Sequence, residues 1–442
     1  SIRARLLQTD RPCYVMKDFN GRVGVSNSGT LVSEGRGLQV LAMASPMTAG
    51  QLGDPTFRAD YKLKYAYKTG AMANGIASAE LVIAIGQANL LASYGAAGQV
   101  PEKIIESINK IQANLPHQTY AVNLIHSPSE QALEAAAVDL FLDKGVKVVE
   151  ASAFLALTEN IVYYRVAGLS RDAENNIVIG NKVIAKISRK EVAIPFMKAA
   201  PADFVQSLLD KGKITAEQAE LAKHVPMADD ITVEADSDGH TDNSPLVALL
   251  PIIIQLRDEM QAQHAFATKI RIGAAGGIST PASALAAFMM GAAYVVTGSV
   301  NQACLEAGTS DYVRKLLQVV ESTDVMGAPA SDMFEMGVDL QVLKRGTLFG
   351  PRAKKLYEYY KRYESIDEIP AAERQNLEQK VFRKPLEEIW QSCIEFFQQR
   401  DPEQIERAKD NPHRKMALIF RWYLGLSSNW ANAGTPDRVL DY

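Results

Sequence analysis

Short apolar runs rich in β-branched residues alternate with helical patterns from about residue 38 to about residue 308. The runs predict eight strands, at Val40–Ala44, Leu81–Ile85, Thr119–Leu124, Val146–Glu150, Lys182–Ile187, Ile231–Ala235, Ile270–Gly273 and Tyr294–Thr297. Helix-like stretches such as residues 101–114 and 129–144 lie between most of them. Eight strand-and-helix units over about 270 residues are typical of a (β/α)8 TIM barrel, an α/β fold. A doubly wound sheet is the alternative.

Three additions interrupt this pattern. Residues 13–31 read as a β-hairpin that turns near Asn20-Gly21. Residues 163–187 read as a second ribbon with a polar tip, and residues 201–225 contain a short helix that begins with the capping box Thr215–Gln218. All three are expected to decorate the barrel rather than belong to it.

The chain is predicted to have three parts. An N-terminal hairpin segment covers residues 1–37, and the barrel covers residues 38–308, with insertions near 163–182 and 201–225. Residues 309–442 are helical and richer in charge, and they are long enough to cover a barrel mouth. One helix face there is apolar, as expected of core packing: Leu386, Ile389, Trp390, Cys393, Ile394 and Phe397.

The seventh and eighth predicted strands end in turns that combine glycine with hydroxyl side chains. Gly276 and Gly277 come before a helix that begins with Pro281, and Gly298 and Ser299 repeat the device about twenty residues later. Backbone N–H groups at such turns hold phosphate after strands seven and eight of TIM barrels. The two turns therefore predict a phosphate site, whereas the GxGxxG and GKS/T patterns of Rossmann and P-loop folds are absent.

Other polar or small residues are expected at the same rim. Ala44 ends the first predicted strand and is followed by Ser45, Pro46 and Met47, while Asn123 lies late in the third strand.

Lys186 is unusual because it lies in an otherwise apolar strand, VIAKIS. One interpretation is a fixed positive charge beside the electron-rich edge of a cofactor, such as the N1 side of a reduced flavin. The other is an ion pair with Glu150 or Glu234 on nearby strands.

Residues 233–246, VEADSDGHTDNSPL, crowd acidic residues and one histidine at the end of the sixth predicted strand. A single histidine with no second one at ligand spacing is a poor metal set, so no metal site is expected. Asp, Ser, Gly and Asn favour turns, which makes a solvated turn an alternative. The interpretation that we favour makes His240 a polar group at the C-terminal rim of the barrel.

Composition narrows the kinds of partner and the compartment that are expected. The net charge is −4 at pH 7, so neither a nucleic-acid nor a membrane-surface partner is expected. The longest apolar run, Leu246–Leu256, is too short to span a bilayer. Cys13, Cys304 and Cys393 are far apart, which argues against a disulfide framework and fits a reducing cytoplasm. A homodimer is compatible with these features.

Several long motifs resemble the PfaD-type trans-acting enoyl reductases of polyunsaturated fatty acid and polyketide synthases. They include YKTGAMANGIASAEL, NKVIAKISRKEVAIPFM, VEADSDGHTDNSPLVALLP, IRIGAAGGIST and VLKRGTLFGPRAKKLYEYY, in this order along nearly the whole chain. The resemblance implies an FMN-binding barrel related to nitronate monooxygenases. It also implies reduction of an enoyl thioester held by an acyl carrier protein, with NADPH or NADH as reductant.

On this resemblance His240 is the expected catalytic residue, as a proton donor or hydrogen-bond donor to the enolate. The expected FMN site comprises Ala44, Ser45, Pro46, Met47, Asn123, Lys186, Asp236, Gly239, Gly276, Gly277, Gly298 and Ser299. An acidic carrier protein would dock on a basic face made by Lys344, Arg345, Arg352, Lys354, Lys355, Lys361 and Arg362, for which a solvated helix surface is the alternative.

The chain departs from the family pattern at two positions. Asp238 stands where the family usually has glycine before Gly-His, and Ser244 stands where it usually has arginine before the proline. Both departures bear on catalysis more than on the fold. They leave two alternatives to enoyl reduction, which are nitronate oxidation on the same barrel and a non-catalytic flavin-binding subunit of a synthase.

Overall fold

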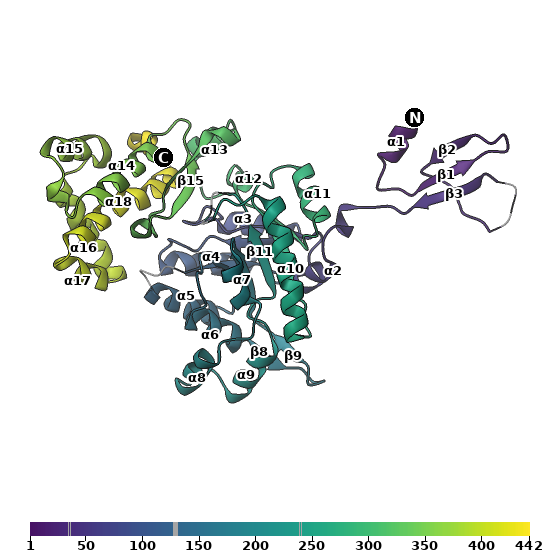
Figure 1. Ribbon diagram of the computed structural model, residues 1–442, viewed down its shortest axis with the longest axis horizontal. Coiled ribbons are helices and arrows are strands. Elements are labelled where there is room, and N and C mark those ends of the chain that lie inside the picture. The colour runs from purple at the N-terminus through teal and green to yellow at the C-terminus, as the bar shows by residue number, and fades with distance from the viewer. Residues whose placement is uncertain (34, 36, 127–130, 238, 240) are drawn as a thin grey trace.

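Eight parallel strands close into a barrel in this computed structural model, which describes residues 1–33, 35, 37–126, 131–237, 239 and 241–442 (Figure 1). In chain order they are β4 (Tyr67–Thr69), β5 (Leu91–Tyr94), β6 (Ala121–Ile125), β7 (Val148–Ser152), β10 (Lys182–Ile187), β11 (Asp230–Glu234), β12 (Arg271–Ala275) and β13 (Val295–Thr297). Strand β13 pairs with β4 and closes the ring. The predicted TIM barrel is confirmed.

Two of the eight predicted barrel strands are wrong. Val40–Ala44 lies in β3 (Gln39–Ala44), which pairs antiparallel with β1 (Cys13–Lys17) outside the barrel. Leu81–Ile85 lies in helix α3 (Ala79–Gln87), whose first turn is capped by the Ser78 hydroxyl. The first two barrel strands are β4 and β5 instead. The other six predictions match β6, β7 and β10–β13 to within two residues at each end.

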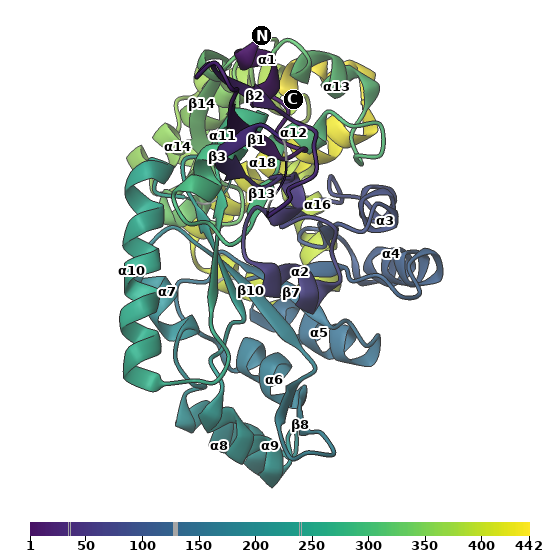
Figure 2. The ribbon, with the colours of Figure 1, turned by 90° about the vertical axis from the view of Figure 1, so that its right-hand side faces the viewer.

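Helices surround the barrel on its outer side. They are α3, α4 (Pro101–Asn114), α5 (Gln131–Asp143), α6 (Glu159–Ala167), α7 (Lys190–Phe196), α8 (Ala202–Asp210), α9 (Ala216–Leu221), α10 (Leu246–His264), α11 (Pro281–Met289) and α12 (Ser299–Gln302). The predicted ribbon is present as β8 (Leu169–Arg171) and β9 (Ile177–Ile179), and the Thr215–Gln218 capping box opens α9 as predicted. Figures 1 and 2 place this ribbon, α8 and α9 at the opposite end of the molecule from the C-terminal helices.

The N-terminal part is a three-stranded sheet with a short helix. Strand β1 pairs with β2 (Val23–Ser26) as the predicted hairpin, and Gly21 takes φ 82° at its turn. Strand β3 adds a third strand on the other side of β1, in the order β2-β1-β3, and α1 (Ile2–Leu6) precedes them. The predicted boundary at residue 37 therefore falls within this sheet. Figure 1 shows the sheet on an extended segment, away from the barrel.

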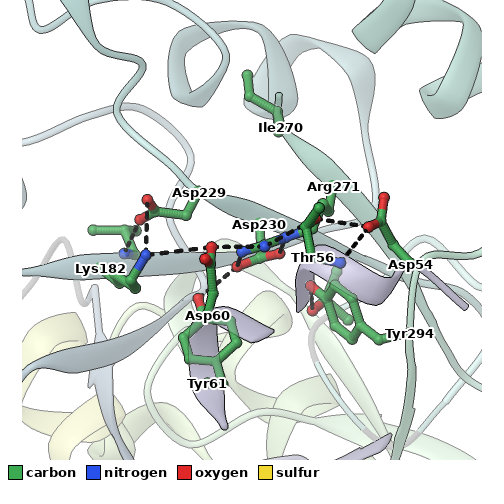
Figure 3. A network of polar contacts seen from close by, with 12 residues as sticks. Asp54, Thr56, Asp60, Tyr61, Lys182, Asp229, Asp230, Ile270, Arg271 and Tyr294 are labelled. Carbon is green, nitrogen blue, oxygen red and sulfur yellow. Dashed lines mark hydrogen bonds and ion pairs between the residues drawn. The ribbon is translucent and has the colours of Figure 1, made fainter. Parts of the chain in front are cut away.

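A buried polar network seals the N-terminal end of the barrel (Figure 3). Arg271, at the start of β12, donates to both carboxylate oxygens of Asp230 at 2.6 and 2.9 Å and to Asp60 at 2.8 Å. Tyr61, in helix α2 (Pro55–Tyr61), donates to Asp230 at 2.5 Å. Polar groups at the N-terminal face of such a barrel serve stability, because active sites occupy the opposite end.

The C-terminal part has a core of its own. Its elements are α13 (Asp311–Leu317), β14 (Val325–Pro329), β15 (Asp339–Leu343), α14 (Phe349–Arg362), α15 (Ala371–Asn376), a π-helix (Leu377–Phe382), α16 (Leu386–Arg400), α17 (Glu403–Lys409) and α18 (Pro412–Ala433). Ile389, Cys393 and Phe397 on the predicted apolar face of α16 are buried in that core. The helical domain is therefore held by apolar packing as well as by its contacts with the barrel.

Candidate active site

The helical domain is attached to the rim formed by the C-terminal ends of the barrel strands. Asn74, in the loop after β4, donates to the hydroxyl of Ser428 on α18 at 2.9 Å. Gln341 on β15 donates to the carboxylate of Asp236, which follows β11. Two more strands, β12 and β13, lie between β11 and β4 in the ring, so the domain spans this sector of the rim.

The two glycine turns lie at the same level within that sector. Ala274 of β12 pairs with Val295 of β13, and Gly277 and Gly298 each come three residues later. Gly277 has φ 69°, and a Cβ atom at either glycine would meet no atom within 4 Å. Within the described part of the chain, neither glycine N–H has a hydrogen-bond partner. Unpaired donors beside open space, on neighbouring strand ends, fit a bound phosphate.

The start of α11 contributes less to this site than the sequence predicts. The helix begins with Pro281 as expected, but Ser283 accepts hydrogen bonds from the N–H groups of Ser279 and Thr280 at 3.1 and 3.0 Å. The N–H of Ser283 in turn bonds the Thr280 hydroxyl. The free donors are thus those of the glycine turns, and Ser299, the first residue of α12, stands beside the second turn.

Lys186 lies in a buried ion-pair network inside the barrel. Its Nζ is 2.9 Å from a Glu234 oxygen and 3.9 Å from a Glu150 oxygen, so the ion-pair interpretation holds for both partners. Glu150 also pairs with Lys68 of β4 and accepts a hydrogen bond from Ser93 at 2.8 Å. Two lysines and two glutamates make the network neutral overall when all four are charged.

Burial disfavours the charged form of each of these groups. The neighbouring opposite charges offset that effect to different degrees. For Glu150, burial alone raises the pKa, but Lys68 and Lys186 together hold it below its ordinary value. For Lys68, burial lowers the pKa despite the nearby Glu150. Burial also acts against the charge of Lys186, but Glu234 and Glu150 raise its pKa above the ordinary range. The surroundings of Lys186 therefore favour its charged form more than those of Lys68 do.

Sequence reasoning missed Lys68 and the loop after β4. The N–H of Ala71 donates to Glu150 at 3.1 Å, so this loop is fixed to the network beneath the rim. The signal was present, because YAYKTGAMA places a lysine inside a short β-like run directly before Gly70. It is the same pattern that drew attention to Lys186.

Asn123 and His126 lie at the end of β6, beside the end of β7, and both bond to Ser152. The buried Asn123 amide donates to the hydroxyl of Ser152 at 3.0 Å. His126 Nδ1 lies 2.6 Å from Glu134, and its ring stacks on Phe154. The structure thus places His126 at the rim, with its ring orientation fixed by a carboxylate.

The loop after β11 is held on both sides of the predicted catalytic histidine. Asp236 N–H donates to the Ser244 carbonyl at 2.9 Å, and Asp242 accepts from Arg189 and from Ser188 at 2.9 Å. These bonds lower the pKa of Asp242, chiefly through Arg189. The loop is thus tied to β15 and to the end of β10.

Gly239 lies against the Glu234 carboxylate of the ion-pair network. A Cβ atom there would come 2.4 Å from a Glu234 oxygen, so only glycine fits at this position without displacing that carboxylate. His240 and Asp238, its neighbours in the sequence, lie outside the described residues.

The structure does not bring Ala44, Ser45, Pro46 and Met47 to the rim. Ala44 ends β3 in the N-terminal sheet, all four residues are exposed, and Met47 N–H bonds the Thr9 carbonyl. The prediction followed from treating β3 as a barrel strand. The loop that does follow the first barrel strand begins at Gly70.

Two features are absent from the residues that the structure describes. No helix among them is both long enough and apolar enough to cross a membrane. No three His, Cys, Asp or Glu side chains in the same part of the chain are grouped so that they could hold a metal ion.

Two family models match the ends of the chain. Residues 1–46 match the fatty acid synthase subunit PfaD N-terminal domain. Residues 363–442 match the inserted helical domain of [acyl-carrier-protein] S-malonyltransferase.

Curated relatives match along most of the chain. It is 48% identical over 445 aligned residues to a polyunsaturated fatty acid synthase subunit of Thraustochytrium sp., an alignment that covers all of this chain and 29% of that protein. It is 45% identical to the polyketide biosynthesis protein PksE of Bacillus subtilis, over 90% of this chain and 51% of PksE. The chain thus spans from about a third to half of these relatives.

A solved structure matches most of the chain. The enoyl reductase domain of MlnA, from the macrolactin biosynthesis cluster of Bacillus amyloliquefaciens, superposes with a TM-score of 0.85 at 40% identity and covers 89% of each chain. Barrel and helical domain are therefore shared as one unit, and the chain belongs to the PfaD-type enoyl reductase family.

Proposed function

We propose that this protein is an FMN-dependent enoyl reductase that acts on enoyl thioesters carried by an acyl carrier protein, in polyunsaturated fatty acid or polyketide synthesis. The observation that carries this proposal is the match with the MlnA enoyl reductase domain over 89% of both chains. The names of the curated relatives support the synthase setting. NADPH or NADH is the proposed reductant.

The rim fits the phosphate and ring of FMN. The unpaired N–H groups of Gly277 and Gly298 would bind the phosphate, with Ser299 beside them. Lys186 and Asn123 lie further round the ring on β10 and β6, where Lys186 would offer its charge to the electron-rich edge of the flavin. FMN bound there and first reduced by NADPH or NADH would supply the hydride that adds to the β-carbon of the enoyl group.

His240 is proposed to complete the addition. Negative charge develops on the thioester oxygen and the α-carbon as the β-carbon receives hydride, and a donor must meet it. The loop that carries His240 is anchored by Asp236 at one end and Asp242 at the other. A histidine on such an anchored loop can donate a hydrogen bond to the oxygen or a proton to the carbon.

One experiment separates the reactions that this barrel could catalyse. The purified protein should show flavin absorption and should oxidise NADPH when crotonyl-acyl carrier protein is added. Oxygen consumption with propionate 3-nitronate, without enoyl reduction, would instead identify a nitronate monooxygenase. Flavin absorption with neither activity would identify a non-catalytic subunit.

Substitution of His240 tests its role within the two half-reactions. In His240→Ala, NADPH should reduce the flavin at a nearly normal rate. Reoxidation of the flavin by the enoyl thioester should slow by roughly 10²–10⁴-fold, the range for loss of an acid–base group. His240→Gln should recover part of the loss if hydrogen bonding to the thioester oxygen dominates. Stopped-flow absorbance of the flavin measures both steps.

Two further variants serve as references for this test. His224→Ala removes an exposed histidine far from the rim and should leave both half-reactions unchanged. Asp238→Gly restores the residue usual in the family and should preserve or improve turnover. Equal slowing of both half-reactions in His240→Ala would show that His240 seats the flavin or supports the loop rather than donating to the enolate.

A further inference from the structure

The N-terminal sheet has no core of its own. Among the described residues of the segment 1–48, Asn27 alone is buried. Register places Tyr14 and Met43 on one face of the sheet and Val15 and Ala42 on the other, so both faces are apolar. Apolar faces that no other described element covers mark sites of association, so we expect this sheet to pack on a partner surface.

A matching surface lies on the outside of the barrel. Helix α11 contains no charged residue, and its Leu285 and Met289 side chains are 46% and 79% exposed. The first half of α10, residues 246–256, also has no charge, and Val247 is 70% exposed. The two helices are neighbours, because they follow the adjacent strands β11 and β12. Helices that are apolar all round are normally buried.

The connection between sheet and barrel is fixed at both ends. On the sheet side, Met47 N–H donates to the Thr9 carbonyl at 2.7 Å. On the barrel side, Asp54 N–H donates to the Ala293 carbonyl at 2.8 Å. The few residues between them are folded into a 3₁₀ turn, Ala49–Gln51, so little free chain remains. Figure 1 shows the sheet held out from the α10–α11 face of its own barrel.

Charge also favours association of the sheet with the rest of another chain. Residues 1–46 contain six Lys and Arg against three Asp and Glu, a net charge of +3. Since the whole chain carries −4, residues 47–442 carry −7. Opposite net charges promote encounter and orient the two surfaces.

We propose that the N-terminal sheet of one chain packs on the α10–α11 face of a second copy, and that the second copy returns the same contact. Such a reciprocal exchange closes with two-fold symmetry, and it covers both apolar surfaces of each chain. The contact lies on the outer wall of the barrel, so it does not depend on the function proposed for the rim.

The first test is the mass of the full chain in solution, by multi-angle light scattering. The unmodified protein should have twice the chain mass. Leu285→Glu/Met289→Glu should reduce it to a single chain mass, because two charges would be buried in the contact. Phe396→Glu, at a 49% exposed site on α16, is the matched control and should leave the dimer intact. A monomeric unmodified protein, or a dimer that survives both α11 charges, would overturn the assignment.

The second test identifies the surfaces in the unmodified fold. A photo-crosslinking p-benzoylphenylalanine replaces Met43, and ¹⁴N- and ¹⁵N-labelled chains are mixed before irradiation. Peptides that link position 43 to residues 281–290 should carry one label of each kind. The same link within a single chain would mean that the sheet folds back on its own barrel. A link between two N-terminal sheets would mean that the β3 edges pair. Either result overturns the exchange.

Discussion

At the residue scale, the buried charges inside the barrel depend on one another for stability. Lys68 and Glu150 are fully buried, and Lys186 and Glu234 continue the network toward the rim. Buried ion pairs contribute little net stability, but loss of one partner leaves an uncompensated charge. The network therefore constrains which substitutions the barrel tolerates beneath the proposed flavin site.

Glu150→Gln should destabilise the fold by about 3–5 kcal/mol, because Lys68 would keep its burial and lose its counter-charge. Lys68→Met in the same chain should recover part of that loss, and urea unfolding measures both. The folded-state pKa of Glu150 lies below its ordinary value, so the stability from its pairing is present above about pH 4.3 and is lost as the pH falls through the folded pKa. The melting temperature of Glu150→Gln should accordingly change less than that of the unmodified protein between about pH 5 and about pH 3. No recovery in the double variant would contradict a pairwise charge effect.

Substitution of Gly277 tests the phosphate turn, and Gly145 provides a control with similar backbone strain. Gly277 and Gly145 have φ 69° and 64°, both are exposed, and a Cβ atom at either would meet nothing within 4 Å. Gly277→Val should lower flavin occupancy, measured from the ratio of flavin to protein absorbance, because a side chain would occupy the space beside the free N–H groups. Gly145→Val carries a similar strain far from the rim and should retain full occupancy. Equal occupancy in both variants would place the phosphate elsewhere.

At the scale of elements, local sequence reveals an element when its own residues determine it. Strand β10 and the capped starts of α9 and α11 were predicted correctly because apolar periodicity and capping side chains lie within each segment. Strand β4 was missed because it has only three residues and contains Lys68, whose partner Glu150 is 82 positions away. Strand β3 was recognised as a strand but assigned to the barrel, since the pairing of an edge strand depends on β1 and not on its own residues.

The same distinction holds for the candidate site. The turns at Gly277 and Gly298 were predictable because a strand, glycine and a helix start follow one another in the chain. The attachment of Gln341 to the loop after β11 was not, since 105 residues separate Gln341 from Asp236. Contacts between domains leave no periodic signal in either segment.

Strand β15 should tune the loop that carries His240. Gln341 donates to Asp236 and lies 3.4 Å from the Asn243 side-chain oxygen, so it holds both sides of that loop. Gln341→Leu should slow enoyl reduction by about tenfold, the effect of one lost hydrogen bond to a charged group, with flavin occupancy unchanged. Gln391→Leu removes a similar exposed bond on α16 and should have no effect. Loss of flavin in Gln341→Leu would mean that β15 supports the cofactor rather than the loop.

At the scale of the whole molecule, the substrate must reach a barrel mouth to which a helical domain is attached. The domain is fixed to the rim at Asn74 and at Asp236, and helix α14 presents exposed Lys354 and Lys355 on its outer face. Two other members of the predicted basic face already form ion pairs within the chain. Arg352 pairs with Asp441 and Arg345 pairs with Asp324. The docking role that remains for α14 therefore falls mainly on its lysines.

Reversal of these charges separates carrier docking from chemistry. A carrier protein is typically acidic, so Lys354→Glu/Lys355→Glu should raise KM for carrier-bound enoyl substrate by about tenfold and spare a pantetheine thioester, which has no carrier protein to dock on α14. The effect should shrink as salt is added, because exposed charges are screened.

The control is Lys62→Glu/Lys64→Glu, which changes the same charge beside α2, at the other end of the barrel. Lys64 lies over Tyr65 much as Lys355 lies over Tyr359. If both pairs raise KM alike, net charge rather than a face on α14 attracts the carrier, and an equal rise for the pantetheine thioester would assign the lysines to the acyl site itself.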